Sequence, residues 1–371
     1  MLATISTTFV ALSTFAILVS AKPGLSLALN GPKQAKGVGE LIITATLINT
    51  GDVELKLLND PRTVLNSFET DTFSITNAAG KSPVFQGAFV KYSPETILAE
   101  KKNSSFTALA PGARIEIKHD LSKAYNFTSA GIDNYDIVAA NAFQYLDDGK
   151  LSTIQATTAY TSGVKLEGML AVSRPSGDQH PPFNNCSASQ QEQIASAAAA
   201  AENYLNGTRE YLYRVFNHTT SAAPSRFASW FGNFTQLNHK KVLTNFIQLG
   251  ARPLSAYTYD CVCDSYGADV FAFVHATDLD TLSVCGLFWD APLTGLDSKA
   301  GTLIQAASHF ATTAATRDLA SGKTASLKLA IDNPAEATVN ADSYEYFAEH
   351  DDLLSSFLIW NHPMWNILNM E

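Results

Sequence analysis

The texture of the chain changes near residue 172, and this change limits the possible folds more than any other feature. Up to that point, short runs rich in β-branched residues alternate with turn signals such as Pro111-Gly112. That spacing predicts an all-β N-terminal unit over 22–172, built as an immunoglobulin-like sandwich. Its clearest strands are expected at 41–48, 54–58, 73–76, 113–118 and 137–140.

The rest of the chain mixes helical periodicity with short apolar runs. A polar, proline-containing linker over 173–182 leads into a second unit, 183–352, for which we expect an α+β fold. The expected elements are an alanine-rich helix at 187–204 that extends or restarts through 209–216, strands at 270–274 and 282–288, a helix at about 299–314 capped by Asp297 or Ser298, and a closing helix at 336–349. A hydrophobic tail, 353–371, is expected to pack back on the core; the alternatives are that it covers the cleft or presents an interaction surface.

The first residues predict the compartment. An apolar stretch within 1–21 ends in the small residues Ser20 and Ala21, which is the pattern of a secretory signal peptide. A membrane anchor is the alternative, but the stretch is short and interrupted by serine and threonine. A net charge of −10 argues against nucleic acid and anionic membranes as partners. Six sequons fit a glycosylated extracellular protein, at Asn103, Asn126, Asn185, Asn206, Asn217 and Asn233.

Four cysteines follow residue 185, namely Cys186, Cys261, Cys263 and Cys285. In an oxidising compartment they predict two disulfides, for which the sequence alone allows three pairings. A metal site at Cys261 and Cys263 is the alternative, and it would lack enough nearby ligands.

One segment has the shape of a zinc-protease motif without its chemistry. In His-Glu-x-x-His, two histidines at i and i+4 on one helical face bind zinc, and the glutamate acts on the zinc-bound water. Here His309 has the second histidine position, Gln305 the first, and Ala306 that of the glutamate, with Asp318 nine residues after His309. Taken alone, this pattern also suits a partly buried helix that contains one histidine.

Collinear segments extend the similarity over about 170 residues. From residue 182 onward the chain resembles the fungal peptidyl-lysine metalloendopeptidases, deuterolysin-like zincins whose third zinc ligand is an aspartate. The matching segments are 185–193, 226–231, 261–263, 285–295, 297–304, 308–310 and 340–349. The N-terminal unit resembles the propeptide domain of the same family at 58–62 and 119–128.

The resemblance implies roles for individual residues. His309 and Asp318 correspond to the second and third zinc ligands, and Asp342 to the acid that receives the substrate lysine; an unassigned aspartate of this kind is otherwise most simply a solvated surface acid. Gln305 replaces the first ligand, Ala306 the general base, and Ser321 a tyrosine that stabilises the transition state. The family pattern also implies the disulfides Cys186–Cys261 and Cys263–Cys285. A glutamine amide is a weak, neutral substitute for imidazole, so we expect zinc to bind weakly or not at all.

Three functional hypotheses follow. The first is a secreted, monomeric family member that is catalytically impaired and binds peptides or proteins through lysine. The second is an active zinc metalloendopeptidase that cleaves at lysine with rearranged ligands. The third is a non-catalytic inhibitor or folding partner of active relatives. The first is favoured because a ligand and the base are lost together.

Overall fold

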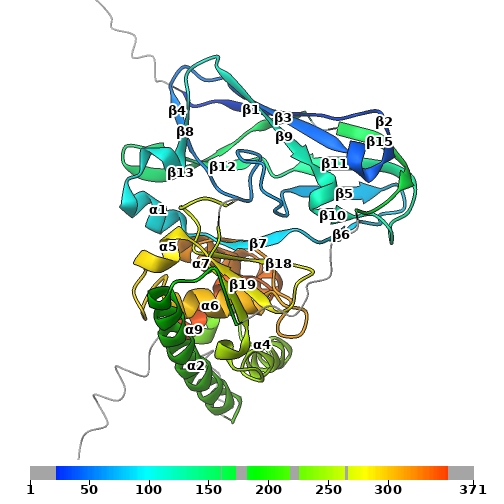
Figure 1. The fold of residues 1–371 in the computed structure, drawn as a ribbon. Coiled ribbons are helices and arrows are strands. Elements are labelled where there is room, and N and C mark those ends of the chain that lie inside the picture. Colours follow the sequence, from blue (N-terminus) through cyan, green and yellow to red (C-terminus); the bar gives the residue numbers. More distant parts are fainter. Residues whose placement is uncertain (1–21, 160, 173–181, 218–224, 264–265, 350–371) are drawn as a thin grey trace, which may run out of the picture.

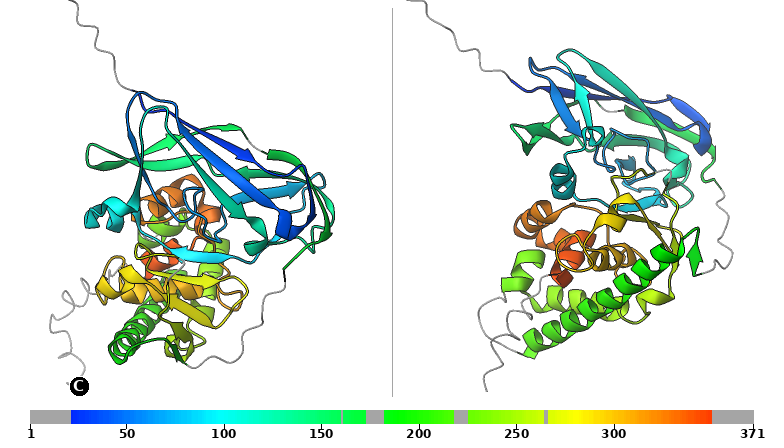
Figure 2. Two further views of the ribbon diagram at one scale, coloured as in Figure 1. Left: turned by 45° about the horizontal axis from the view of Figure 1, so that its top comes forward. Right: turned by 60° about the vertical axis from the view of Figure 1, so that its left-hand side comes forward.

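The computed structural model describes residues 22–159, 161–172, 182–217, 225–263 and 266–349. It has two parts, which lie one above the other in Figures 1 and 2. The N-terminal part consists mainly of β-strands, and the C-terminal part combines helices with a sheet. The expected signal peptide, nearly all of the expected linker and the hydrophobic tail lie outside the described residues.

The N-terminal part contains three four-stranded sheets and one small two-stranded sheet. The first sheet has the order β14-β1-β3-β9, the second β2-β15-β11-β5, and the third β13-β12-β4-β8. Their strands are β1 (Leu25–Asn30), β2 (Gln34–Gly37), β3 (Ile42–Asn49), β4 (Leu55–Leu58), β5 (Phe73–Asn77), β8 (Phe106–Leu109), β9 (Arg114–Asp120), β11 (Asp133–Ala139), β12 (Ala142–Asp147), β13 (Lys150–Gln155), β14 (Thr157–Ala159) and β15 (Thr161–Met169); the small sheet pairs β6 (Val84–Phe85) with β10 (Tyr125–Asn126).

Alternating burial explains why these segments form strands. Along β3, the residues at every second position are buried, which is the pattern of a strand with one face on a core. All five strands expected from the sequence are present, as β3, β4, β5, β9 and β11. The immunoglobulin-like sandwich stays a prediction.

The C-terminal part surrounds a five-stranded sheet of order β16-β17-β19-β18-β7. Its strands are β16 (Phe183–Asn184), β17 (Thr258–Asp260), β18 (Ala272–His275), β19 (Thr281–Val284) and β7 (Ala88–Lys91). The helices are α2 (Ala188–Asn217), α3 (Ser225–Phe231), α4 (Gln236–Leu249), α5 (Gly286–Asp290), α6 (Lys299–Ser308), α7 (Lys323–Asp332), α8 (Pro334–Ala337) and α9 (Ala341–Glu349). Helices α6 and α9 pack on each other and share one apolar core with α2.

Three expected elements of this part had wrong bounds. The helix expected at 299–314 ends at Ser308, whose carbonyl oxygen accepts from the Thr316 amide; the chain turns back through Ala315, whose φ of 49° is left-handed. Only the first half of 282–288 is strand, and the second half begins α5. The closing helix is broken into α8 and α9, so that Asp342 lies in the first turn of α9. By contrast, the alanine-rich helix is continuous through 217.

Strand β7 belongs to the N-terminal part in sequence but to the C-terminal sheet in space. It pairs antiparallel with β18, and helix α1 (Pro94–Glu100) follows it directly. An apolar cluster around this strand combines Val90, Tyr92 and Ile97 with Phe271 and Leu287. The two parts therefore share a buried interface, in which β7 is the innermost strand (Figure 1).

Both disulfides have the pairing that the family resemblance implied. Cys186 pairs with Cys261, and Cys263 pairs with Cys285, with Cα–Cα distances of 5.1 and 5.3 Å. The first bridge closes a loop of 75 residues and ties the start of α2 to the sheet. Within the described ranges, no helix is both long and apolar enough to cross a membrane.

Candidate functional site

Helix α6 carries the residues of the degenerate zinc motif. It starts at Ser298, whose hydroxyl oxygen accepts a hydrogen bond from the Gly301 amide. Three residues of the motif, Gln305, Ala306 and His309, are all buried. The spacing of four places Gln305 and His309 on one helical face, as it would two histidine ligands.

His309 is held as zinc-ligand histidines are held. Its Nδ1 lies 2.9 Å from the carbonyl oxygen of Thr316 and donates to it. The other ring nitrogen, Nε2, is directed at Gln305 and Asp318. A backbone carbonyl on the far nitrogen is a common outer contact of a metal-binding histidine. The outer contact that is typical of a metal-binding histidine is therefore present at His309.

The side-chain amide of Gln305 fills the space between His309 and Asp318. Its Nε2 lies 3.2 Å from His309 Nε2 and 3.2 Å from Asp318 Oδ1, so the two amide hydrogens satisfy both acceptors. A cation would need those same lone pairs. With a hydrogen-bond donor among them, and only two strong ligands, the residues do not fit a catalytic zinc, which usually has three protein ligands.

The surroundings keep Asp318 ionised. Burial alone would raise the pKa of its carboxyl group, but the His309 ring and the Val90 amide hold that pKa below its ordinary value. Ala306, at the position of the general base, presents only a buried methyl group. Among the described side chains, no three His, Cys, Asp or Glu residues are grouped so that they could hold a metal ion.

A second pocket, rich in carboxylates, adjoins this site. Asp342 takes part in both, because its Oδ1 lies 3.4 Å from Gln305 Nε2 and its Oδ2 lies 3.6 Å from the Nζ atom of Lys91. Lys91 is fully buried, and its Nζ also lies 2.7 Å from Glu345 Oε2 and 3.2 Å from Asp297 Oδ1. The Tyr346 ring faces the same ammonium group, 4.8 Å from its centroid. Asp342 is thus a buried acid, and its interpretation as a solvated surface acid was wrong.

The carboxyl groups of this pocket differ in the direction in which their pKa is shifted. Burial raises the pKa of Asp342 and, more strongly, that of Glu345, although Lys91 opposes both shifts. Burial also tends to raise the pKa of Asp297. Lys91, together with the Tyr346 and Ser93 hydroxyls, nevertheless brings that pKa below its ordinary value. Glu349, one helical turn beyond Glu345, has its pKa raised by burial to about 7. The pocket can therefore stabilise one buried cation.

Strand β7 passes between these two sites. Lys91 pairs with Ala272, Val90 with Phe273 and Phe89 with Val274. The Val90 amide donates to Asp318 Oδ2 over 2.8 Å, and the Phe89 ring stacks on His309 with centroids 4.4 Å apart. The degenerate zinc site is therefore covered by the backbone that precedes Lys91.

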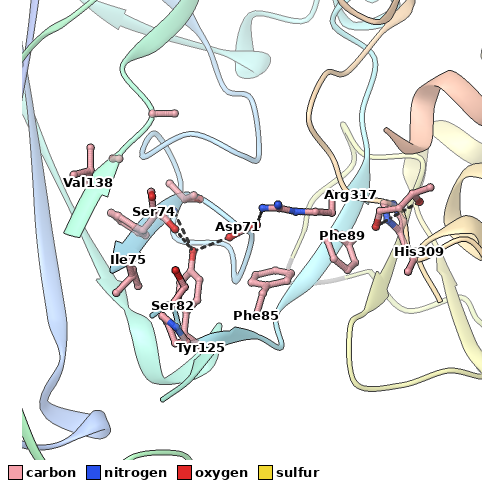
Figure 3. A pocket seen from close by; sticks show the side chains of 17 residues that line it. Asp71, Ser74, Ile75, Ser82, Phe85, Phe89, Tyr125, Val138, His309 and Arg317 are labelled. Atoms are coloured by element: carbon pink, nitrogen blue, oxygen red, sulfur yellow. Dashed lines mark hydrogen bonds and ion pairs between the residues drawn. The ribbon is translucent and has the colours of Figure 1, made fainter. Parts of the chain in front are cut away.

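A cavity of about 800 Å³ opens beside the covered site. Figure 3 shows it bounded on one side by Phe89 and His309, and on the other by side chains of the N-terminal part. Arg317 reaches across it to Asp71, with 2.9 Å between Nη2 and Oδ2. The two parts of the molecule thus meet around one cleft.

Comparison with known proteins supplies the family. A family model described as lysine-specific metallo-endopeptidase matches residues 216–349. The chain is 41% identical over 351 residues to a peptidyl-Lys metalloendopeptidase of Grifola frondosa, covering 93% of this chain and 98% of the relative. A peptidyl-Lys metalloendopeptidase of Armillaria mellea is 43% identical over 340 residues, covering 91% and 94%. This chain belongs to the peptidyl-Lys metalloendopeptidase family.

The family is one of zinc metallopeptidases. A solved structure, a zinc peptidase from Grifola frondosa, is 39% identical, covers 45% of this chain and 98% of its own, and has a TM-score of 0.42. The family model and the two relatives confirm the resemblance inferred from the collinear segments.

The structure brings together the residues that the family resemblance selected. Gln305, His309, Asp318 and Asp342 form one connected group of hydrogen bonds. Ser321, where the resemblance implied a tyrosine, is buried, and its hydroxyl oxygen has no hydrogen-bond partner among the described residues.

Sequence reasoning missed the other half of the site. Glu345 and Glu349 recur with Asp342 at i, i+3 and i+7, a spacing that would have placed them on one helical face. Asp297 was considered only as a helix cap, whereas Ser298 is the cap and Asp297 binds Lys91. Lys91 gave no local signal, since its partners lie more than 200 residues away in the sequence.

Proposed function

We propose that this chain is a secreted member of the peptidyl-Lys metalloendopeptidase family whose catalytic machinery is impaired. The observation that carries the proposal is the Gln305 amide, which donates hydrogen bonds to both remaining ligand side chains where a zinc ion would accept their lone pairs. A carboxylate is also missing at position 306, and general-base catalysis typically supplies about 10²–10⁴-fold in rate.

Lysine recognition is the second part of the proposal. It is supported by the buried pocket around Asp342, which surrounds an ammonium group with carboxylates and an aromatic face. Such a pocket selects a primary amine, because an uncharged side chain there would leave buried carboxylates without a counterion. We therefore propose that the pocket binds lysine side chains of peptides or proteins without leading to hydrolysis.

The remaining parts of the proposal concern context. Two disulfides fit the oxidising compartment that the expected signal peptide implies. Four sequon asparagines, Asn103, Asn185, Asn206 and Asn233, are exposed and accessible to glycosylation, and Asn126 is half-buried. We further propose a monomer with an immunoglobulin-like N-terminal domain, a zincin-like C-terminal domain and a linker between them. The inhibitor hypothesis draws some support from β7, because this strand occupies a cleft of the C-terminal part. The strand occupies the cleft of its own chain, however, and not that of an active relative.

Metal content and activity test the main proposal. After dialysis at neutral pH, elemental analysis should find zinc far below one ion per chain, and peptides containing lysine should remain uncleaved. The matched control is His309→Ala, which should not change the zinc content. Stoichiometric zinc that disappears in His309→Ala, together with cleavage at lysine, would establish the rearranged active enzyme instead.

A further inference from the structure

We propose that the lysine pocket already has an occupant: Lys91 of the same chain, which β7 presents as a bound peptide would present a lysine. An external lysine must therefore displace this strand. The inference deepens the proposed function, and it rests on only one part of that proposal, namely that the pocket recognises lysine.

The first argument is the origin of the partners of Lys91. Its ammonium group faces Asp297, Asp342 and Glu345, all of which belong to the C-terminal part. The Tyr346 hydroxyl lies 3.4 Å from the same nitrogen. Lys91, a residue of the N-terminal part, is thus buried among acidic and aromatic groups of the C-terminal part, as a ligand is buried in its receptor.

The second argument is the way the backbone is held. Strand β7 extends the C-terminal sheet at β18, antiparallel and in a register that runs from Ala88 to Lys91. Addition of a strand to a sheet edge, with a side chain in a specificity pocket, is a general mode of peptide recognition. Asp318 adds a contact to this backbone, since it accepts from the Val90 amide. The remnant of the zinc site therefore serves as a peptide anchor.

The third argument is that the strand is fixed at its far end as well. Immediately after Lys91 the chain enters α1, where the hydroxyl groups of Ser93 and Thr96 lie 2.7 and 3.0 Å from Asp297 Oδ2. The Thr324 amide donates to Glu95 Oε1 over 3.0 Å. Asp297 thus binds Lys91 through one oxygen and the start of α1 through the other, which couples lysine recognition to docking of the N-terminal part.

Truncation and chemical rescue test the occupant. Lys91→Ala removes three carbons and the nitrogen, which leaves a cavity the size of n-propylammonium next to the carboxylates. Adding n-propylammonium chloride should recover most of the thermal midpoint lost in this variant, in a saturable manner. The wild type, whose pocket is full, should show no comparable shift. The uncharged 1-propanol should recover nothing, because it offers no counterion to the carboxylates.

The control variant is Lys102→Ala. Lys102 is an exposed lysine that comes shortly after α1 and forms its ion pair with Glu100, the last residue of that helix. It should respond to the amine as the wild type does. An equal amine response in the wild type and in Lys91→Ala would show that the pocket is open. A folded Lys91→Ala variant that shows no response, or one that responds equally to 1-propanol, would also overturn the inference.

A measurement on the unmodified protein covers the case in which Lys91→Ala does not fold. Acylation of the native chain, mapped by mass spectrometry, should leave Lys91 unreacted while exposed Lys123 is modified. Equal reactivity of the two lysines would contradict the inference. These outcomes are independent of the proposed loss of catalysis, since a zinc-loaded, active chain could still show amine rescue and a metal-free chain could fail to show it.

Discussion

The two adjacent sites in the cleft differ in what holds them together. The metal side, formed by Gln305, His309 and Asp318, is a hydrogen-bonded network in which the Gln305 amide bridges the other two side chains. The lysine side has stayed charged, with Lys91 surrounded by carboxylates. A zinc site can lose one ligand without disturbing the helix that carried it, since glutamine and alanine both suit a helix. A buried charge cluster cannot lose a member so easily, because the partners left behind remain buried.

This difference shows that a side chain can be needed for folding without being needed for binding a peptide. Asp342 belongs to both sites, and its contact with Lys91 gives it a structural role whether or not any external peptide binds. Conversely, Ser321 has no hydrogen-bond partner among the described residues and contributes to neither site. Keeping an acid at position 342 is thus what stability alone would require of this chain.

Repair of the metal side should produce the largest effect. Gln305→His with Ala306→Glu should bind about one zinc per chain, because the two histidines would again share a helical face with Asp318 nearby. The repaired chain should then cut its own backbone next to Lys91, where β7 crosses the site. Intact mass and N-terminal sequencing would detect the cut.

The single variant Gln305→His serves as the control for the repair. It should bind zinc but cut about 10²–10⁴-fold more slowly, since it lacks the base. A double variant that is folded, holds zinc and yet leaves the chain intact would show that β7 does not lie in a productive position.

Removal of the positive charge on the lysine side should have the next largest effect, a loss of stability. Lys91→Met keeps the length of the side chain but leaves buried carboxylates unpaired, so it should lower the free energy of unfolding by about 3–5 kcal/mol. Urea denaturation measures the change. Lys102→Met, at an exposed pair with Glu100, should cost less than about 1 kcal/mol. Equal effects of the two substitutions would deny the lysine side its structural role.

The pH dependence of the free energy of unfolding should reflect the buried carboxyl group of Glu349. Burial raises the pKa of Glu349 from 4.5 to about 7, so between these values the folded chain binds more protons than the unfolded chain. The resulting stabilisation is fully present below pH 4.5 and is lost as the pH rises through 7. Glu349→Gln should therefore remove a decline of a few kcal/mol in unfolding free energy across this window.

Unfolding midpoints of the wild type and Glu349→Gln, taken at several pH values, test this expectation. Glu349 accepts from the amide and hydroxyl of Ser298, and Gly301 leaves room for it by having no Cβ. Parallel pH profiles in the two proteins would place the titrating group elsewhere.

The bridge across the open cavity should have the smallest effect. Arg317 and Asp71 link the two parts beside the metal side, but the Arg317 side chain is 58% exposed. Arg317→Gln should lower the free energy of unfolding by less than about 1 kcal/mol, and less still at high salt. Lys328→Gln, at the exposed pair with Asp332 within α7, is the matched control. A much larger loss of unfolding free energy for Arg317→Gln would mean that the ion pair across the cavity, and not the cluster around Lys91, holds the two parts together.

Local patterns accounted for much of the molecule. The β-rich texture before residue 172 predicted β3, β4, β5, β9 and β11, and alanine-rich periodicity predicted α2. Element ends were harder to predict, as α6 shows: its sequence favours helix beyond Ser308, but the left-handed turn at Ala315 brings Thr316 back to His309. Such an ending depends on a contact between turns and not on helix propensity.

The sequence by itself determined the state of the metal side. A zinc motif on one helix is local, so the identities of residues 305, 306 and 309 suffice to predict that a ligand and the base are missing. Only the tertiary structure determined what fills the lysine pocket. Lys91 and Asp297 are 206 residues apart, and they meet because β7 joins a sheet whose other strands come from the C-terminal part. Strand pairing over such a distance has no periodicity in the sequence, since the backbone supplies its hydrogen bonds and any residue can supply a backbone.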